Sequence, residues 1–196
     1  MSAADRERWN ERFRVQGAGY DPKPSEWLVA LEPTLRPRRE SAPALDLACG
    51  GGRHSLYLAG LGYRVDAWDV SEVGLDLLRA ELERRRLVGN TLDVSPRQVD
   101  LDQAMLPAGR YDLVLVSYYL ERAHSAGIAA ALRPGGLLIF HTFLQAAGIR
   151  IAHAPANPAY VLQPGELAAA FSTLETLEYL EDPNQGVARL VARRPG

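Results

Sequence analysis

Short apolar runs and longer amphipathic stretches follow one another along most of the chain. The run at 111–119 is continuous and rich in β-branched and aromatic residues, which indicates a strand buried on both faces. Four other runs also have the length of a strand. Five strands are therefore expected, at 44–49, 63–70, 97–102, 111–119 and 136–143.

The stretches between these runs have the features of helices. The segment 71–86 begins with Ser71, a good N-cap residue. Its apolar residues fall on one helical face: Val73, Leu77, Leu78 and Leu82. A shorter helix over 54–62 ends in glycines, and further helices are expected at 123–132 and 164–171.

The pattern changes near the C-terminus, where two strand-like runs at 173–182 and 186–194 are joined by a turn-rich link. They predict an antiparallel hairpin. Pro134 and Gly135 suit the centre of a type II turn before the fifth strand. The repeated strand–helix alternation predicts an α/β fold with a doubly wound parallel sheet and helices on both faces. In such folds, ligands bind beyond the carboxyl ends of the strands.

The length and charge of the chain limit the number of domains, the cellular compartment and the partners to be expected. A chain of 196 residues has room for a single α/β domain over 1–196. No apolar run is long enough to span a membrane, and the charged N-terminus lacks the apolar core of a signal peptide, so we expect a cytoplasmic protein. The net charge of −2 and the short arginine clusters do not favour nucleic acid as a partner. No pattern specifies an oligomeric state.

Two residue counts exclude familiar chemistries. Lys23 is the only lysine, so the glycines at 50–52 lack the lysine of a P-loop. Cys49 is the only cysteine, which rules out an internal disulfide and a cysteine-based zinc site. The His, Asp and Glu residues show no spacing typical of a metal site.

The candidate chemistry lies in and after the predicted strands. Three glycines at 50–52 let the backbone approach a ligand closely, where the next helix presents free N–H groups to an anion. Asp46, Asp69 and Asp100 lie within or near the ends of the first three strands. Three buried carboxylates at one edge indicate a ligand with hydroxyls, an amine or a positive charge, although each one alone also suits a cap or a salt bridge. Asp69 ends the second strand and suits the two hydroxyls of a ribose.

Two classes of nucleotide site fit these residues. A nicotinamide-binding loop would have the spacing G-x-G-x-x-G, but Ser55 stands where the third glycine belongs. The order of motifs instead resembles class I S-adenosylmethionine-dependent methyltransferases: LDLACGGGRHSLYLA, VDAWDVS, VDLD, YDLVLVSYYLER and LRPGGLLIFHTF. Ala48 replaces a glycine that is frequent in the family's loop. With NPAYVLQPGEL before its last helix, the chain is similar to the small tellurite-resistance methyltransferases.

The resemblance implies a three-layer fold whose seven-stranded, mostly parallel sheet has the order 3-2-1-4-5-7-6, with strand 7 antiparallel. It implies a bacterial enzyme that transfers a methyl group from S-adenosylmethionine to a small-molecule acceptor by in-line displacement and releases S-adenosylhomocysteine. Residues 1–40 would form an N-terminal helical lid. Trp9, Arg12 and Phe13 would cover the cofactor, and Tyr20 is a further candidate for this cover.

The resemblance also assigns roles to site residues. The backbone of Gly50 and Gly52 would lie along the methionine part of the cofactor, and Asp46 would face its ammonium group. Asp69 would hold the ribose hydroxyls. Arg53 suits the methionine carboxylate, a substrate anion or a solvated helix end. The remaining cofactor-binding candidates are Val70, Asp100 and Leu101 at the adenine, and Ser117 and Tyr118 near the sulfonium.

His141 and Tyr118 are the candidate catalytic residues. His141 ends the fifth strand, where it suits a general base and equally a polar residue satisfied by a neighbour. Further acceptor-side candidates are Tyr119, Arg122, His124, Thr142, Phe143, Asn157 and Tyr160. Two other functions stay open: an NAD(P)-dependent oxidoreductase on a Rossmann-like fold, and a non-catalytic module that binds S-adenosylmethionine.

Overall fold

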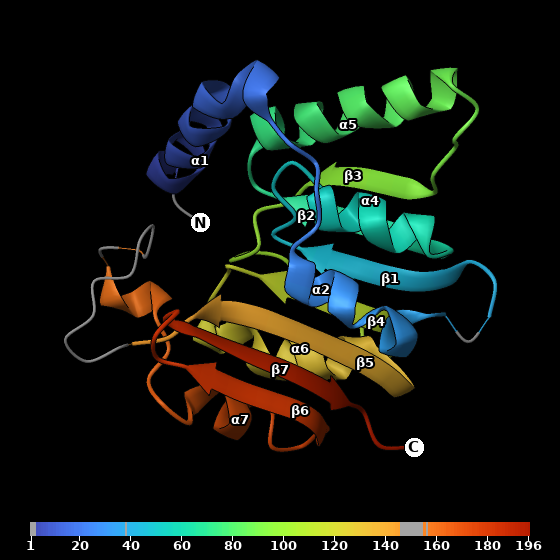
Figure 1. The fold of residues 1–196 in the computed structure, drawn as a ribbon. Coiled ribbons are helices and arrows are strands. Elements are labelled where there is room, and N and C mark those ends of the chain that lie inside the picture. The colour runs from blue at the N-terminus through green and yellow to red at the C-terminus, as the bar shows by residue number, and fades with distance from the viewer. Residues whose placement is uncertain (1–2, 38, 146–154, 156) are drawn as a thin grey trace. The chain divides into compact units, whose positions relative to one another are not determined.

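Seven strands form one sheet in the order β3-β2-β1-β4-β5-β7-β6 (Figure 1). The computed structural model describes residues 3–37, 39–145, 155 and 157–196. Strand β7 runs antiparallel to β5 and β6, whereas β1, β2 and β3 pair in parallel, as do β4 and β5. The expected fold class and strand order are therefore confirmed. The chain divides into two compact units, Met1–Met105 and Leu106–Gly196, which we call the N-terminal and C-terminal units.

The N-terminal unit contains three strands and the expected helical N-terminal segment. Its strands are β1 Ala42–Leu47, β2 Tyr63–Asp69 and β3 Val94–Gln98. Its helices are α1 Ala3–Gln16, the 3₁₀ turn η1 Gly17–Gly19, α2 Glu26–Ala30, α3 Glu32–Leu35, α4 Arg53–Gly60 and α5 Glu72–Leu87. The expectation of a single domain over 1–196 stays a prediction.

Helix α5 begins as its sequence predicts, because the Ser71 hydroxyl accepts a hydrogen bond from the Gly74 N–H at 3.1 Å. The buried face differs slightly from the prediction. Leu75 and Leu78 are fully buried, whereas Val73, Leu77 and Leu82 are half-buried. The buried face of α5 is rotated toward Leu75, because the helix packs through Leu78 on Leu56 of α4 and Ala67 of β2.

Strand β3 begins three residues before the start of the predicted 97–102 and ends four residues before its end. It pairs with β2 from Val65↔Val94 to Asp69↔Gln98, so both strands end together. Asp100 therefore lies in the loop beyond the strand. Pro96 is compatible with β3 because the strand forms an edge of the sheet.

The C-terminal unit contains the other four strands. They are β4 Tyr111–Ser117, β5 Leu132–Phe143, β6 Glu175–Asp182 and β7 Val187–Arg193. Its helices are η2 Arg122–His124, α6 Ser125–Ala131, η3 Pro158–Tyr160 and α7 Glu166–Ala170. The terminal hairpin, β6 and β7, is confirmed.

Strand β5 begins four residues before the predicted 136–143. Gly135 has the positive φ expected of a type II turn, +77°, but it lies inside the strand. The register shifts from Tyr111↔Leu132 to Leu113↔Leu137, so the extra residues between Leu132 and Leu137 are accommodated as a bulge.

The described helices are short or carry many charges. Within residues 3–37, 39–145 and 157–196, none has both the length and the apolar character that a bilayer crossing requires.

Candidate active site

The loop between β1 and α4 turns through three left-handed residues. Ala48, Gly50 and Gly52 have φ angles of +59°, +57° and +77°. Glycine adopts this conformation freely, whereas a residue with a Cβ is strained by about 1 kcal/mol or more. Gly52 is the N-cap of α4, so the loop delivers the chain directly to a helix N-terminus. Ala48 keeps the loop conformation despite its side chain.

Asp69 ties this glycine loop to the start of α5. Its Oδ2 accepts a hydrogen bond from the Gly50 N–H and its Oδ1 accepts one from the Ser71 N–H, both at 2.7 Å. The side chain is buried, and burial raises its pKa while the two backbone amides oppose that rise. A carboxylate accepts about four hydrogen bonds, so each oxygen retains capacity for a ligand hydroxyl.

Asp46 lies below the same loop, in β1. Its Oδ2 accepts a hydrogen bond from the Ser55 hydroxyl at 2.5 Å, and the residue is 1% exposed. Burial raises the pKa of Asp46 to about 7, the Ser55 hydrogen bond opposes this rise, and the nearby Asp69 charge adds to it. Asp46 therefore changes charge near neutral pH.

The predicted adenine-side residues occupy the loops after β2 and β3. Val70 and Leu101 are buried. Asp100 caps its own loop, where its carboxylate accepts hydrogen bonds from the Asp102 N–H and the Gln103 side-chain amide, both at 3.2 Å. This capping role is the alternative that the sequence left open. Arg53 is the first residue of α4 and is half-buried.

Aromatic side chains of the N-terminal segment cover the glycine loop. A Cβ added at Gly50 would lie 2.7 Å from Cζ of Phe13, and one at Gly51 would lie 2.6 Å from the Tyr20 ring. Asn10, which sequence analysis did not identify, accepts a hydrogen bond from the Ser71 hydroxyl at 2.8 Å. The absence of side chains at the three glycines thus allows aromatic rings, and not only a ligand, to approach the loop closely.

The other two predicted lid residues support Phe13. The Trp9 and Phe13 rings lie 6.4 Å apart between centroids, and the Arg12 guanidinium lies 5.1 Å from the Trp9 centroid. Closure of residues 1–40 as a lid stays a prediction.

In the C-terminal unit, Ser117, Tyr118 and His141 come together at the carboxyl ends of β4 and β5. Ser117 pairs with His141 across the two strands, and the Tyr118 N–H donates to the His141 carbonyl at 2.7 Å. The Tyr118 ring lies 4.6 Å from the His141 ring and 4.8 Å from the Phe143 ring. His141 is 4% exposed and Tyr118 is 40% exposed. The two candidate catalytic residues are therefore in direct contact.

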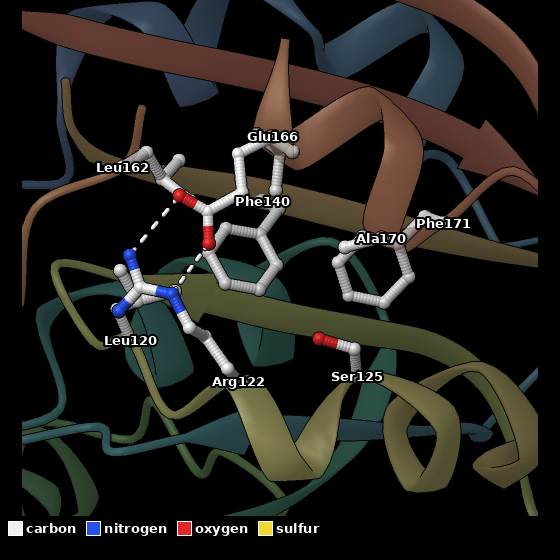
Figure 2. A pocket seen from close by; sticks show the side chains of 9 residues that line it. Leu120, Arg122, Ser125, Phe140, Leu162, Glu166, Ala170 and Phe171 are labelled. Atoms are coloured by element: carbon white, nitrogen blue, oxygen red, sulfur yellow. Dashed lines mark hydrogen bonds and ion pairs between the residues drawn. The ribbon is translucent and has the colours of Figure 1, made fainter. Parts of the chain in front are cut away.

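Other acceptor-side candidates have structural partners. Arg122 binds Glu166 through its Nε at 2.5 Å and its Nη2 at 3.0 Å, and donates to the carbonyls of Ala159 and Val161 at 2.6 and 3.1 Å. Figure 2 shows this ion pair beside a cavity of about 220 Å³. Arg122 thus holds residues 159–161 against the chain that follows β4.

The remaining acceptor-side candidates are polar groups of loops and strand ends. The Tyr119 hydroxyl and His124 Nδ1 are 2.9 Å apart, and the Asn157 side chain accepts from the Ala159 N–H at 3.0 Å. Thr142 is buried in β5, and Tyr160 ends η3. Over the described part of the chain, His, Cys, Asp and Glu side chains form no cluster suited to a metal ion.

Comparison with known proteins links this geometry to one family. The family model described as tellurite resistance protein TehB matches residues 34–187, which include the glycine loop, Asp69 and His141. A curated relative from Haemophilus influenzae, "Probable S-adenosyl-L-methionine-dependent methyltransferase TehB", is 28% identical over 145 residues. The match covers 70% of this chain and 48% of the relative.

Two further matches extend the comparison. A ubiquinone biosynthesis O-methyltransferase from Bordetella avium is 32% identical over 130 residues, covering 62% of this chain and 49% of the relative. The crystal structure of TehB from Haemophilus influenzae superimposes with a TM-score of 0.71 at 23% identity, covering 87% of this chain and 62% of that chain. The chain thus spans about half the length of the curated relatives it matches.

Proposed function

This chain belongs to the tellurite resistance protein TehB family, and on that premise we propose that it transfers a methyl group from S-adenosylmethionine to a small-molecule acceptor. The proposal draws on the names of two relatives, which are both methyltransferases. The observation that carries it is the buried Asp69 carboxylate, bonded to the glycine loop through Gly50 and to α5 through Ser71.

The residues of the N-terminal unit fit an adenosyl cofactor. Asp69 has hydrogen-bonding capacity for the ribose hydroxyls, and Asp46 in its ionised form would face the ammonium group. Gly50 and Gly52 would lie along the methionine part, and Arg53 would pair with the carboxylate. Val70, Asp100 and Leu101 would surround the adenine. When bound, S-adenosylmethionine would supply a methyl group for in-line displacement, with its sulfonium sulfur as the leaving group that becomes a neutral thioether.

The residues of the C-terminal unit would orient the acceptor. Holding a nucleophile in line converts a bimolecular step into a nearly unimolecular one, which is the main contribution the chain makes to the rate. Tyr118 and Ser117 would line the acceptor's position. His141 would accept a proton from an oxygen or nitrogen nucleophile, while a nucleophile that is already anionic needs no base.

We also propose that the protein works in the cytoplasm of a bacterium and takes no nucleic acid as substrate. The net charge of −2 supports the second point, because nucleic acid binding depends on clustered positive charge. The relatives described above come from Haemophilus influenzae and Bordetella avium, which supports a bacterial source.

Calorimetry with S-adenosylhomocysteine tests the cofactor site. Replacing Asp69 with alanine is expected to weaken binding by about 2–4 kcal/mol, because a charged hydrogen-bonding partner is lost. Asp66→Asn is the matched control, since Asp66 is also buried in β2 but projects to the opposite face. Equal affinity in the Asp69→Ala variant and the wild type would remove Asp69 from the site.

The same titrations separate the competing functions. Binding of a reduced nicotinamide dinucleotide without binding of S-adenosylhomocysteine would identify an oxidoreductase. Binding of S-adenosylhomocysteine without methyl transfer to thiols, chalcogen oxyanions or small amines would identify a non-catalytic module.

A further inference from the structure

The cavity in the C-terminal unit is enclosed by β5, by the chain that follows β4, and by α6 and α7 (Figure 2). Its volume is about 220 Å³, and its wall consists mainly of large buried apolar side chains: Leu120, Phe140, Leu162, Leu167 and Phe171. An empty void of this size forfeits packing contacts that a ligand would restore. An engineered apolar cavity of about 150 Å³ binds benzene, so this one has room for a substituted six-membered ring.

The cavity is separate from the two candidate catalytic residues. Phe140, which lines the cavity, and His141 are consecutive residues of β5 in regular register with β4, so their side chains project from opposite faces of the sheet. The Tyr118 ring packs against His141 and Phe143. The cavity is therefore not part of the proposed site of methyl transfer.

The two charged side chains that line the cavity neutralise each other. The Nε and Nη2 of Arg122 donate to the Glu166 carboxylate at 2.5 and 3.0 Å, and Nη1 donates to the Ala159 carbonyl at 2.6 Å. The Glu166 carboxylate also accepts a hydrogen bond from the Gln163 N–H at 2.8 Å. A charged ligand would lose its hydration here without gaining an uncompensated counter-charge. The lining thus favours a neutral ligand.

Among the described residues that line the cavity, Ser125 has the one uncharged polar side chain. Its hydroxyl points into the cavity (Figure 2). In the described part of the chain, no other group donates a hydrogen bond to this hydroxyl or accepts one from it. A hydroxyl can donate one hydrogen bond and accept two, so it suits a ligand hydroxyl in either direction.

Two aromatic rings in the wall favour a ligand that contains a ring. The Phe140 and Phe171 centroids lie 5.5 Å apart, with the ring planes inclined by 49°. A ligand ring can meet such a pair in the offset or edge-to-face geometries that aromatic rings prefer. An apolar wall with a few polar groups that orient the ligand is the usual composition of a small-molecule site.

We propose that this cavity is a second ligand site, which binds a neutral ring compound that carries a hydroxyl and is about as large as p-cresol. The ring packs against Phe140 and Phe171, and the hydroxyl forms a hydrogen bond with Ser125. The inference goes beyond the proposed function and does not depend on it, because none of the lining residues is assigned to the cofactor.

Binding of three related compounds to the isotope-labelled full chain, followed by NMR titration, tests the proposal. p-Cresol, toluene and 4-methylbenzoate share a ring and a methyl group but carry a hydroxyl, no polar group and a carboxylate. The wild type is expected to bind p-cresol saturably, and at least about tenfold more tightly than 4-methylbenzoate, because the carboxylate would be buried without a counter-charge. Ser125→Ala is expected to weaken p-cresol binding about three- to tenfold and to leave toluene binding unchanged, since one hydrogen bond is lost.

A second variant tests whether the compounds bind in this cavity. Ala170 lines the cavity but is exposed on α7, so Ala170→Phe is expected to fill the space without displacing the core and to weaken binding of p-cresol and toluene at least about tenfold. Ala169→Phe is the matched control, because Ala169 is exposed on the same helix and does not line the cavity. It is expected to bind both compounds as the wild type does. Thermal unfolding checks that each variant is folded, and Ser125→Ala decides the matter if Ala170→Phe does not fold.

Four results would overturn the inference. They are no saturable binding of p-cresol to the wild type, equally tight binding of 4-methylbenzoate, an equal loss of toluene and p-cresol binding in Ser125→Ala, or wild-type binding of p-cresol in Ala170→Phe. The last result would also be seen if p-cresol bound at the proposed methyl-transfer site instead. The titrations contain no cofactor, so failure of the proposed function would not change their outcome.

Discussion

At the scale of single residues, the two buried carboxylates near the glycine loop differ in how their negative charges are stabilised. Backbone amides, including those of Gly50 and Ser71, stabilise the charge of Asp69, whereas the side chain and backbone of Ser55 stabilise that of Asp46. For Asp46 the effect of burial outweighs these hydrogen bonds and raises the pKa to about 7, so the carboxylate is costly to keep ionised. Asp46 is thus better explained by a cationic ligand than by the stability of the fold.

Asp46→Asn is expected to make the protein more stable at alkaline pH. The pKa of Asp46 is 3.8 in its ordinary state and about 7 in the fold, so between these values the folded state binds more protons than the unfolded state. The contribution of Asp46 to stability therefore falls as the pH rises from about 4 to 7, and is constant above that. Asparagine does not titrate, so at pH 8 the variant should be more stable by about 1–3 kcal/mol.

Urea unfolding of the wild type and the Asp46→Asn variant at several pH values checks this expectation. The stability difference should grow between about pH 4 and pH 7 and then level off. A difference that does not depend on pH would contradict the pKa shift. The same variant should bind S-adenosylmethionine more weakly at pH 8, because the cofactor's ammonium loses its counter-charge.

At the scale of elements, the N-terminal segment is bound to the glycine loop through side chains rather than through sheet pairing. Tyr20 packs on Gly51, whose backbone is not in the left-handed region. Gly51→Ala therefore tests the contact without adding backbone strain. The variant should lose about 1–3 kcal/mol of stability, because the new methyl group overlaps the Tyr20 ring.

A double-mutant cycle isolates this contact. In a Tyr20→Ala background, Gly51→Ala should be neutral or slightly stabilising, since alanine restricts the unfolded chain and no ring is left to displace. Equal costs in both backgrounds, measured by thermal unfolding, would show that the Tyr20 contact does not form in solution.

Arg122 plays a similar connecting role in the C-terminal unit. It links Glu166 at the start of α7 to the carbonyls of Ala159 and Val161 (Figure 2). Arg122→Met should speed amide hydrogen exchange over residues 157–167 by about tenfold or more, because several charge-assisted hydrogen bonds are lost together.

Hydrogen exchange with mass spectrometry provides the measurement. Arg133→Met is the control, since Arg133 forms a longer, partly exposed ion pair with Asp112 at 3.4 Å. Unchanged exchange over 157–167 in the Arg122 variant would mean that the ion pair does not hold this segment.

At the scale of the whole molecule, the sequence predicted what depends on local patterns. The strand–helix alternation, the Ser71 cap and the terminal hairpin were all readable, because capping and periodicity are properties of neighbouring residues. The strand order followed from the resemblance to a known family. The boundaries of β3 and β5 were wrong because pairing with β2 and β4 determines them.

The candidate site was predictable to a similar degree. Asp69 and the glycines have a local signature, since Asp69 ends one strand and the glycines follow another. Asn10 has none, because a hydrogen bond between distant segments brings it to Ser71 beside the glycine loop. The hydrogen bonds that Asp100 accepts within its own loop depend on a loop geometry that spacing alone does not determine.

A crystal structure of the protein with S-adenosylhomocysteine tests the central claim most directly. The ligand is expected along Gly50 and Gly52, with both ribose hydroxyls within hydrogen-bonding distance of the Asp69 carboxylate. Phe13 and Tyr20 are expected to shift and contact the ligand instead of the bare loop. An empty glycine loop with Phe13 and Tyr20 still packed on it, at saturating ligand, would show that this loop does not bind the cofactor.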